Sequence, residues 1–283
     1  MGKERLKKDK YRDNNESKSN NNNNSYQKQK SGSRKSKVSV NSKLFNAEDT
    51  QLDIAKKLKL TKLPQYITDE KGYIEFSKGL LIGGRFVILN TLGRGTFSKV
   101  FESIDIDEQK RVAIKVIRNT HRYIEAAKTE TKVLQHITSM DDGKSACIHL
   151  REYFSWNNHP VFVFKLYGPS IYSIMSKNRF RPFPDQITRS LTFQICNAIQ
   201  FLHHLGIIFT DLKPENMVFI DGRTQSIQIH NKTHYLPINS QIKIVDFGSA
   251  VYEPRYDPNN PKTYKFKDGY NYLIQTRHYR APE

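Results

Sequence analysis

Apolar and polar residues alternate along residues 86–120 in three successive runs. The runs FVILNTL, SKVFESIDI and KRVAIKVI each predict a β-strand, because alternation sends neighbouring side chains to opposite faces of a sheet. Gly93-Arg94-Gly95 separates the first run from the second as a turn. The later stretch IHLREYFSWNNHPVFVFKLYG, residues 148–168, predicts a hairpin that turns at residues 157–160.

The apolar period changes to that of a helix in two longer stretches. RYIEAAKTETKVLQHI, residues 122–137, places four apolar side chains on one helical face, namely Ile124, Ala127, Leu134 and Ile137. DQITRSLTFQICNAIQFLHHLG, residues 185–206, predicts a long helix with Asp185 as its N-cap and Gly206 as its stop. A β-rich unit followed by a mainly helical one indicates the α+β fold class.

Composition sets the first part of the chain apart. Residues 1–37 hold twelve Lys or Arg and four Asp or Glu, so they carry +8 of the net charge of +18. We expect a disordered, basic, Asn/Ser/Lys-rich tail over residues 1–57. Its basic runs are interpreted either as solvated chain, or as a nuclear-import signal or a weak electrostatic contact with RNA or acidic partners. Direct nucleic-acid recognition is not expected, because no aromatic residues interleave a basic patch.

The cysteine spacing and the lack of recognisable targeting signals predict a soluble intracellular protein. Cys147 and Cys196 are far apart and form no CxxC pair, which argues against a disulfide or zinc framework. The start MGKERLKKDK lacks the apolar core of a signal peptide, and Leu6 breaks the myristoylation pattern. No apolar run approaches the length of a membrane span, so no membrane partner is expected.

The polar loop in IIFTDLKPENMVF, residues 207–219, carries the most specific chemistry. Asp211 can accept the proton of an attacking hydroxyl, and Lys213 can neutralise charge on a moving phosphoryl group. Asn216 and the later Asp246 of IVDFGSA offer oxygen atoms, which Mg²⁺ prefers together with nucleotide phosphates. This loop, followed in order by Asp-Phe-Gly and Ala-Pro-Glu, predicts phosphoryl transfer.

Two weaker signals agree with that prediction. Gly93 and Gly95, followed by Val100, form a loop whose backbone N–H groups can approach phosphates closely, although a glycine-rich hairpin is also a common turn. Lys115 in VAIK points from a strand, and Glu130 on the helical stretch can pair with it. A solvent-facing position suits Lys115 and Glu130 equally well.

These motifs resemble those of eukaryotic protein kinases. The resemblance runs from residue 86 to the end, through GRGTFSKV, VAIK, TDLKPEN, DFG and APE. RYIEAAKTETKVLQHI, VDFGSA and TRHYRAPE are most similar to the LAMMER (CDC-like, CLK) kinases of the CMGC group. The resemblance implies a bilobal fold, with a β-rich N-lobe and its lead-in over residues 58–167 and part of a helical C-lobe over residues 168–283.

The same resemblance implies an activity. Kinases of this group use ATP and Mg²⁺ to phosphorylate Ser and Thr of proteins, often with tyrosine autophosphorylation. Their typical substrates are Arg/Ser-rich splicing factors in the nucleus. We therefore expect ATP and Mg²⁺ as cofactors, protein substrates as partners, and a nuclear location that can extend to the cytoplasm.

The resemblance also implies a role for individual residues. Asp211 resembles the catalytic base and Lys213 the phosphate-stabilising lysine, while Lys115 would hold the α- and β-phosphates with Glu130 as its partner. The implied nucleotide-binding positions are Gly93, Gly95, Val100, Ala113, Lys115, Lys165, Tyr167 and Val218, and the implied metal ligands are Asn216 and Asp246. Phe164 would close the back of the pocket. The apolar members of this set would equally suit a hydrophobic core.

Three positions depart from the family pattern. Ser98 stands where a third glycine is preferred, and Ser173 stands where related kinases often carry an Asp for the ribose. Phe209 replaces the His with which the catalytic loop usually begins, two residues before the Asp at 211. We expect the Phe209 ring to pack beside Phe247 and Leu134 and so to preserve the buried column that the His normally completes.

The activation segment raises two further expectations. Thr210 offers no guanidinium to clamp a phosphorylated loop, so switching by that pairing is not expected. The stretch YNYLIQTRHYR is similar to the DYRK group and makes Tyr270 and Tyr272 either autophosphorylation sites or merely exposed tyrosines.

Because the sequence ends at Glu283, we expect a C-lobe truncated after Ala-Pro-Glu. The alternative function is a truncated or pseudokinase-like protein that binds nucleotide or a partner without catalysis.

Overall fold

The computed structural model describes residues 48–229, 231–253 and 274–282. The predicted tail before residue 48, Tyr270, Tyr272 and Glu283 lie outside the described residues. Within the described ranges no helix is both long enough and apolar enough to cross a bilayer.

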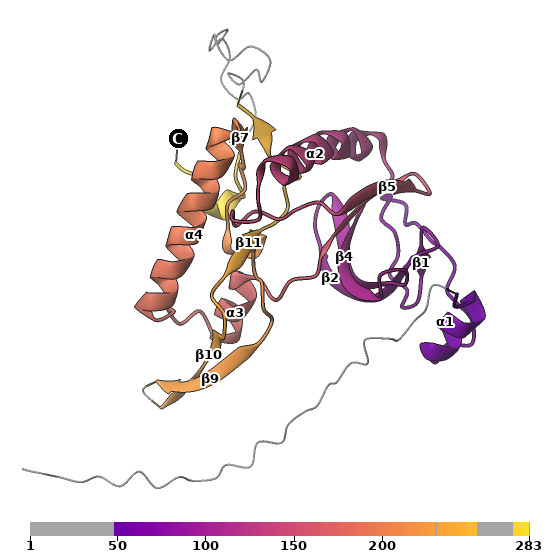
Figure 1. Cartoon of the computed structure of the whole chain (residues 1–283), viewed down its shortest axis with the longest axis horizontal. Helices are drawn as coiled ribbons and strands as arrows, with labels where there is room; N and C mark the ends of the chain where they lie inside the picture. The colour runs from indigo at the N-terminus through magenta and orange to yellow at the C-terminus, as the bar shows by residue number, and fades with distance from the viewer. Residues whose placement is uncertain (1–47, 230, 254–273, 283) are drawn as a thin grey trace, which may run out of the picture. The chain divides into compact units, whose positions relative to one another are not determined.

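The predicted strands form one antiparallel sheet. In the described part of the chain it has six strands in the order β1-β2-β3-β4-β6-β5. Figure 1 labels β1, β2, β4 and β5 of this sheet. Their bounds are β1 (Leu81–Ile82), β2 (Phe86–Arg94), β3 (Ser98–Asp105), β4 (Lys110–Ile117), β5 (Glu152–Trp156) and β6 (His159–Lys165). The three strands predicted over residues 86–120 are thereby confirmed.

The hairpin over residues 148–168 is confirmed, but its turn is shorter than predicted. Trp156 pairs directly with His159, so only Asn157 and Asn158 form the turn. Both have positive φ, 48° and 62°, a conformation that Asn tolerates better than most residues. His159 and Pro160 therefore belong to strand β6 and not to the turn.

Alternation along β4 decides which side chains face the functional cleft. Val112, Ile114 and Val116 point into a buried cluster with residues of β2, β3 and β6. Ala113 and Lys115 point to the opposite face, because successive side chains of a strand alternate. Lys115 is thus placed away from the sheet's own core and toward Glu130 of helix α2.

Helix α2 (His121–Met140) packs beside β4 and β6 with the predicted apolar face (Figure 1). Ala127, Leu134 and Ile137 are buried, whereas Ile124, nearer the start of the helix, is half-buried. Glu130 lies on the same face and is also buried, and a carboxylate is rarely buried unless it is paired, as Glu130 is with Lys115.

Residues 48–57 correct the predicted extent of the disordered tail. Helix α1 (Gln51–Lys57) begins with a capping box, in which Thr50 Oγ1 accepts from the Asp53 N–H at 3.2 Å and the Asp53 carboxylate accepts from the Thr50 N–H at 3.1 Å. Ile54 and Ala55 are buried, and Ile54 packs on Val87 and other residues of β2 and β3. The free energy gained by burying Ile54 and Ala55 therefore keeps this segment folded, although its neighbours in the sequence are mostly polar.

The C-terminal part is mainly helical with short strand pairs. Helices α3 (Ile171–Lys177) and α4 (Asp185–His204) accompany η1 (Pro214–Asn216) and η2 (Arg277–Tyr279), and α4 packs against β7 (Ile207–Ile208) and β11 (Ile242–Ile244) (Figure 1). Strand β8 (Met217–Phe219) pairs with β11, and β12 (Val251–Tyr252) pairs with β7.

The boundaries of α4 are partly as predicted. Gly206 has φ +66° directly after the C-cap and ends the helix as expected. The predicted N-cap is wrong, because Pro184 occupies that position and Asp185 is the first helical residue. An acidic side chain in the first turn still interacts favourably with the helix dipole.

A second hairpin was not predicted. Strands β9 (Thr224–Ile229) and β10 (Lys232–Pro237) pair in antiparallel register from Thr224–Pro237 to Ile229–Lys232. Two hydrogen bonds of 2.7 Å each tie the backbone of Tyr235 to the side chain of Asn178, just after α3. This polar hairpin is therefore held to its surroundings by hydrogen bonds.

The Asp141 carboxylate at the end of α2 stabilises the turn that follows. It accepts from the Ser145 N–H at 3.0 Å and pairs with His149 Nε2 at 2.6 Å, and its side chain is 3% exposed. Hydrogen bonds from Ser145 and His149 outweigh burial and lower the pKa of Asp141 from 3.8 to about 2. The ionised carboxylate is therefore the form that the folded state prefers.

We expect Asp141→Asn to lower the free energy of unfolding at pH 7 by about 2 kcal/mol, because a pKa shift of this size has that value. Since the folded-state pKa is depressed, this stabilisation is present above the ordinary carboxyl pKa and is lost as pH falls through about 2. Urea unfolding of wild type and variant from pH 7 to pH 3 measures the difference. The exposed neighbour Asp142, changed to Asn, should have little effect, and equal stability of Asp141→Asn and wild type at pH 7 would contradict the prediction.

Candidate active site

One cleft collects nearly all of the predicted site residues. It has a volume of about 770 Å³ and lies between the glycine-rich β2–β3 loop, the segment after β6 and the loop that follows β7. Its wall includes Gly93, Gly95, Val100, Ala113, Lys115, Glu130, Phe164, Lys165, Tyr167, Ser173, Lys213, Asn216, Val218 and Asp246. Asp211 does not line this cleft itself, but Lys213 and Asn216 hydrogen-bond to it from the cleft wall.

A buried ion network occupies the inner end of the cleft. Lys115 Nζ lies 2.6 Å from Glu130 Oε1 and 2.7 Å from Asp246 Oδ1. The side chains of Lys115 and Glu130 are 7% and 4% exposed, whereas that of Asp246 is 50% exposed. The lysine and glutamate are thus neither solvent-facing nor unpaired, and Asp246 is the member that faces the open space.

Charge pairing fixes the protonation of this network. Burial alone would lower the pKa of Lys115, but Asp246 and Glu130 outweigh it and raise that pKa. Lys115 in turn holds the pKa of Asp246 below its ordinary value. Burial raises the pKa of Glu130, and the ammonium of Lys115 opposes the change. At neutral pH the cleft therefore presents a fixed ammonium beside an exposed carboxylate.

Local backbone geometry places Asp246 within reach of Lys115. Asp246 has φ +66°, an uncommon conformation that turns the chain directly after β11. The Val245 N–H donates to the Asn216 carbonyl at 2.9 Å and so fixes this turn against the catalytic loop. A Cβ at Gly248 would come within 3.3 Å of Asp246 Oδ1 and 3.4 Å of Lys115 Nζ, so glycine there leaves room for the ion pair.

The loop after β7 forms a second polar cluster around Asp211. Lys213 Nζ donates to Asp211 Oδ2 at 2.6 Å, and Asn216 Nδ2 donates to the same oxygen at 3.1 Å and to the Asp211 carbonyl at 3.0 Å. Pro214 begins the short helix η1, whose end carries Asn216. A Pro at the first helical position is favourable because its missing N–H has no intrahelical partner there.

Thr276 belongs to this cluster of polar side chains, although the sequence patterns did not predict it. Its hydroxyl donates to Asp211 Oδ1 at 2.6 Å and accepts from Lys213 Nζ at 2.7 Å, and its N–H donates to Asp211 Oδ1 at 3.2 Å. Both carboxylate oxygens of Asp211 are therefore bonded. The available signal was the position of this threonine in TRHYRAPE, shortly before Ala-Pro-Glu.

The same contacts set the charge of Asp211. Burial would raise its pKa, but the hydrogen bonds from Lys213 and Thr276 outweigh burial and hold the pKa below its ordinary value. Asp211 is thus ionised at neutral pH and able to accept a proton. Its partners also orient the side chain, because both oxygens are held.

The glycine-rich loop leaves space above the cleft. A Cβ on Gly93 would meet nothing within 4 Å, and one on Gly95 would meet only the Ser98 carbonyl, at 3.9 Å. Ser98, the departure from the family pattern, begins β3 and is buried. Glycine at residues 93 and 95 is therefore not required by packing inside this structure, which favours the alternative that a ligand approaches there.

The segment after β6 forms the outer wall of the cleft. Phe164 is buried, Lys165 is exposed and Tyr167 is half-buried. A Cβ on Gly168 would lie 2.7 Å from the Cα of Gly222, so this glycine is required by the close approach of two backbones. The segment is thereby fixed against the loop that follows β8.

Three apolar residues face the cleft from two sides. Val100, Ala113 and Val218 are half-buried and line the cleft, whereas the core alternative would have buried them fully. They come from β3, β4 and β8, so strands remote in sequence together supply an apolar slot in the cleft. Such a slot suits a flat aromatic ligand.

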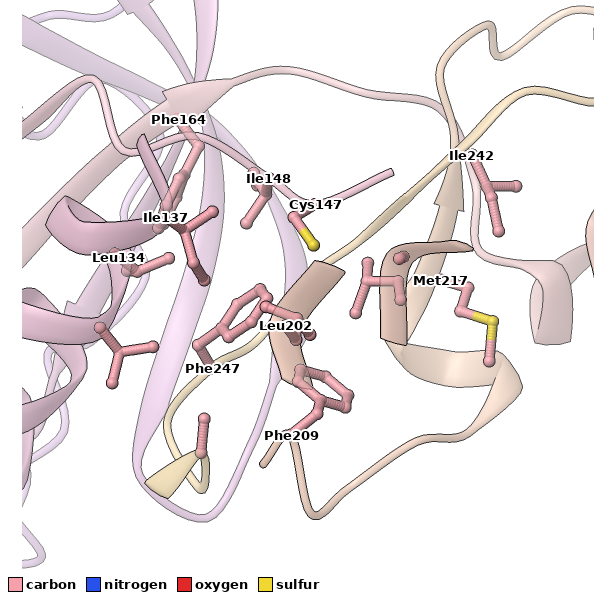
Figure 2. Packing of buried hydrophobic residues seen from close by; sticks show 14 of the residues in the cluster. Leu134, Ile137, Cys147, Ile148, Phe164, Leu202, Phe209, Met217, Ile242 and Phe247 are labelled. Atoms are coloured by element: carbon pink, nitrogen blue, oxygen red, sulfur yellow. The ribbon is translucent and has the colours of Figure 1, made fainter. Parts of the chain in front are cut away.

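Phe209 packs as predicted. Its ring centroid lies 4.9 Å from that of Phe247, with the planes at 71°, and both side chains are buried (Figure 2). Leu134 of α2 belongs to the same buried cluster (Figure 2). Thr210 directs its hydroxyl to the Ser249 carbonyl at 2.7 Å. The ring contact joins the catalytic loop to the Asp246–Gly248 turn.

Comparisons with known proteins agree with this geometry. The sequence model of the protein kinase domain family matches residues 86–283. The Caenorhabditis elegans protein named probable dual specificity protein kinase madd-3 is 37% identical over 77% of this chain and 23% of its own length. Human dual specificity protein kinase CLK4 is 37% identical over 76% of this chain and 43% of its own. Dual specificity protein kinase KNS1 of Saccharomyces cerevisiae is 40% identical over 76% and 30%.

A solved structure shows the same fold. The crystal structure of a kinase domain matches with a TM-score of 0.65 at 29% identity and covers 76% of this chain and 61% of that chain. This chain spans less than half the length of the three relatives named above. The match over residues 86–283, together with the sheet and the two polar clusters in one cleft, shows that this chain belongs to the protein kinase family and is similar to its CDC-like dual-specificity members.

Proposed function

We propose that this chain is the nucleotide-binding and catalytic part of a protein kinase that transfers the γ-phosphoryl group of ATP to Ser and Thr of proteins, and to Tyr by autophosphorylation. The observation that carries the proposal is the meeting of two polar clusters in one cleft. Lys115, Glu130 and Asp246 form the first, and Asp211 with Lys213 forms the second.

The residues present fit ATP and Mg²⁺. The apolar slot suits an adenine, and the open face of the glycine-rich loop leaves room for phosphates beside Lys115. Among the described residues, no group of three or more His, Cys, Asp or Glu side chains is placed to hold a metal ion. Mg²⁺ bound with a nucleotide needs only one or two protein oxygens besides the phosphates, and Asp246 and Asn216 offer such oxygens at the cleft wall.

The proposed chemistry assigns one task to each polar residue. ATP supplies the γ-phosphoryl group, whose bond to the β–γ bridging oxygen breaks as a bond to the substrate oxygen forms, leaving ADP. Asp211 accepts the hydroxyl proton, since its carboxylate is ionised and oriented. Lys213 offsets the negative charge near the transferred group, and Lys115 stays charged and positioned by Glu130.

We further propose Arg/Ser-rich proteins of the splicing machinery as substrates and the nucleus as the place of action. The likeness to CDC-like kinases supports the first, and the basic residues 1–37 support the second. Glu215, in the wall of the cleft and four residues after Asp211, offers a carboxylate with which a substrate arginine would pair. The dual-specificity names of the relatives support tyrosine autophosphorylation.

A thermal-shift measurement followed by a transfer assay tests the proposal. Mg·ATP at a hundredfold excess over its Kd should raise Tm by about 5 °C or more. Labelled γ-phosphate should then appear on the serines of an Arg/Ser peptide. The matched control peptide has its arginines replaced by glutamine and should be a poorer substrate.

Each outcome separates one part of the proposal from another. Stabilisation without transfer to any protein or peptide would overturn the enzyme and support the alternative of a nucleotide-binding protein. Equal transfer to the Arg/Ser and Gln/Ser peptides would overturn the substrate class and leave the kinase intact. No stabilisation and no transfer would overturn the whole proposal.

A further inference from the structure

A turn from the lead-in segment contacts the glycine-rich loop from outside the cleft. The turn comprises residues 69–74, which precede the sheet in the chain. The Tyr73 hydroxyl lies 2.7 Å from the Thr96 carbonyl and 3.0 Å from the Gly95 carbonyl and donates its proton between them. Tyr73 is 7% exposed, although the loop residues it holds are exposed.

Basic side chains enclose the Tyr73 ring. The Arg94 and Arg118 guanidinium carbons lie 4.5 and 4.7 Å from the ring centroid, and Lys99 Nζ lies 5.7 Å from it. Cations at these distances are attracted to the negative face of an aromatic ring. Arg94 belongs to the glycine-rich loop and Arg118 follows β4, so the ring joins two elements that are not adjacent in sequence.

Further hydrogen bonds connect the same elements. Arg118 Nε donates to the Lys71 carbonyl at 2.7 Å, and the Arg118 N–H donates to the Phe97 carbonyl at 3.0 Å. Lys99 Nζ donates to the Ile74 carbonyl at 2.7 Å. The turn thus contacts both the loop that faces the cleft and the segment that leads into α2.

The turn is itself rigidly built. The Asp69 carboxylate accepts from the Lys71 N–H at 3.0 Å and the Tyr73 N–H at 2.8 Å. Gly72 has φ +80° and accepts from the Asn119 N–H at 3.0 Å, while a Cβ there would lie 2.6 Å from the Asn119 side chain. Only glycine meets both requirements, so the turn is fixed at the start of α2 before any ligand binds.

We propose that residues 69–74 act as a clamp that positions the glycine-rich loop over the nucleotide phosphates, with Tyr73 as its positioning residue. Gly93 and Gly95 have open space around them, so without an anchor the loop would lose much conformational entropy on closing over a ligand. The clamp reduces that loss by holding the Gly95 and Thr96 carbonyls from behind. This inference rests on the proposed binding of ATP in the cleft.

The clamp predicts a selective effect on phosphate-bearing ligands. Tyr73→Phe keeps the ring between its cations and removes the hydroxyl contact. We expect the Kd and the KM for Mg·ATP to rise about two- to tenfold, the range for one lost hydrogen bond, with kcat little changed. The Kd for adenosine, which lacks phosphates, should stay the same. Tyr73→Ala also loses the ring and should weaken Mg·ATP binding further.

Tyr66→Phe in the full chain is the matched control. Tyr66 lies in the same lead-in segment and its hydroxyl contacts buried His159 at 2.9 Å, away from the glycine-rich loop. Hydrogen exchange of the backbone over residues 93–100, without any ligand, should quicken in Tyr73→Phe and stay at the wild-type rate in Tyr66→Phe.

The exchange and binding measurements separate a failure of the clamp from a failure of the proposed ATP site. Equal exchange over residues 93–100 in Tyr73→Phe and wild type would overturn the clamp, and so would an equal loss of ATP and adenosine affinity. If the wild-type protein bound neither ATP nor adenosine, the proposed ATP site would be overturned. The exchange measurement would then decide only whether Tyr73 holds the loop, and the phosphate-positioning role would be overturned with the ATP site.

Discussion

Asp211→Asn is expected to lower the rate of γ-phosphoryl transfer by about 10²–10⁴-fold, the usual contribution of a positioned general base. The amide has nearly the shape of the carboxylate but cannot accept the hydroxyl proton. Single-turnover transfer to an Arg/Ser peptide measures the change. The Kd for Mg·ATP should stay near its wild-type value, because Asp211 does not line the nucleotide cleft.

The surroundings of Asp211 make this variant informative. Its two oxygens accept hydrogen bonds from Lys213, Asn216 and Thr276. The side-chain NH₂ group of an Asn at this position would therefore face groups that already donate, and one hydrogen bond would be lost. Asp142→Asn makes the same chemical change at a 60% exposed side chain and should leave transfer unchanged. Transfer by Asp211→Asn within a factor of a few of wild type would show that another group accepts the proton.

Sequence patterns predicted the long strands and helices, in which the spacing of apolar residues is regular. Strands β2 to β4 and helix α2 were found because alternation and helical spacing are strong signals over long segments. The order of charged residues predicted which side chains gather in the cleft. Lys115 and Glu130 illustrate the limit, because only the structure shows that this pair is buried, joined at 2.6 Å and shared with Asp246.

Elements held by particular contacts could not be predicted. The β9–β10 hairpin has a mostly polar sequence, and its anchor is the side chain of Asn178, far away in the chain. Helix α1 depends on a two-residue apolar face and a capping box that uses Asp53 where Glu or Gln is usual. Thr276 bonds to Asp211, 65 positions away in the chain, and Tyr73 bonds to Gly95, 22 positions away. No local sequence pattern encodes such contacts.

Phe209→Ala is expected to lower the free energy of unfolding by about 3–5 kcal/mol, because it removes a buried aromatic ring and leaves a cavity. The lost ring packs at 4.9 Å against Phe247, the neighbour of Asp246, so the carboxylate that faces the cleft should also lose its fixed position. We therefore expect a fall in phosphoryl transfer in the protein that remains folded. Urea unfolding and transfer assays at a temperature well below Tm measure the two effects separately.

Phe209→His tests why the catalytic loop begins with phenylalanine here. A planar ring of similar position should keep the contact with Phe247, so this variant should transfer phosphate at a rate close to that of wild type. Phe193→Ala removes the same ring from a 69% exposed site on α4 and should change neither stability nor transfer much. If Phe209→His lost as much activity as Phe209→Ala, ring packing alone would not explain the residue. Retained activity in Phe209→Ala would instead show that the aromatic contact stabilises the fold without positioning Asp246.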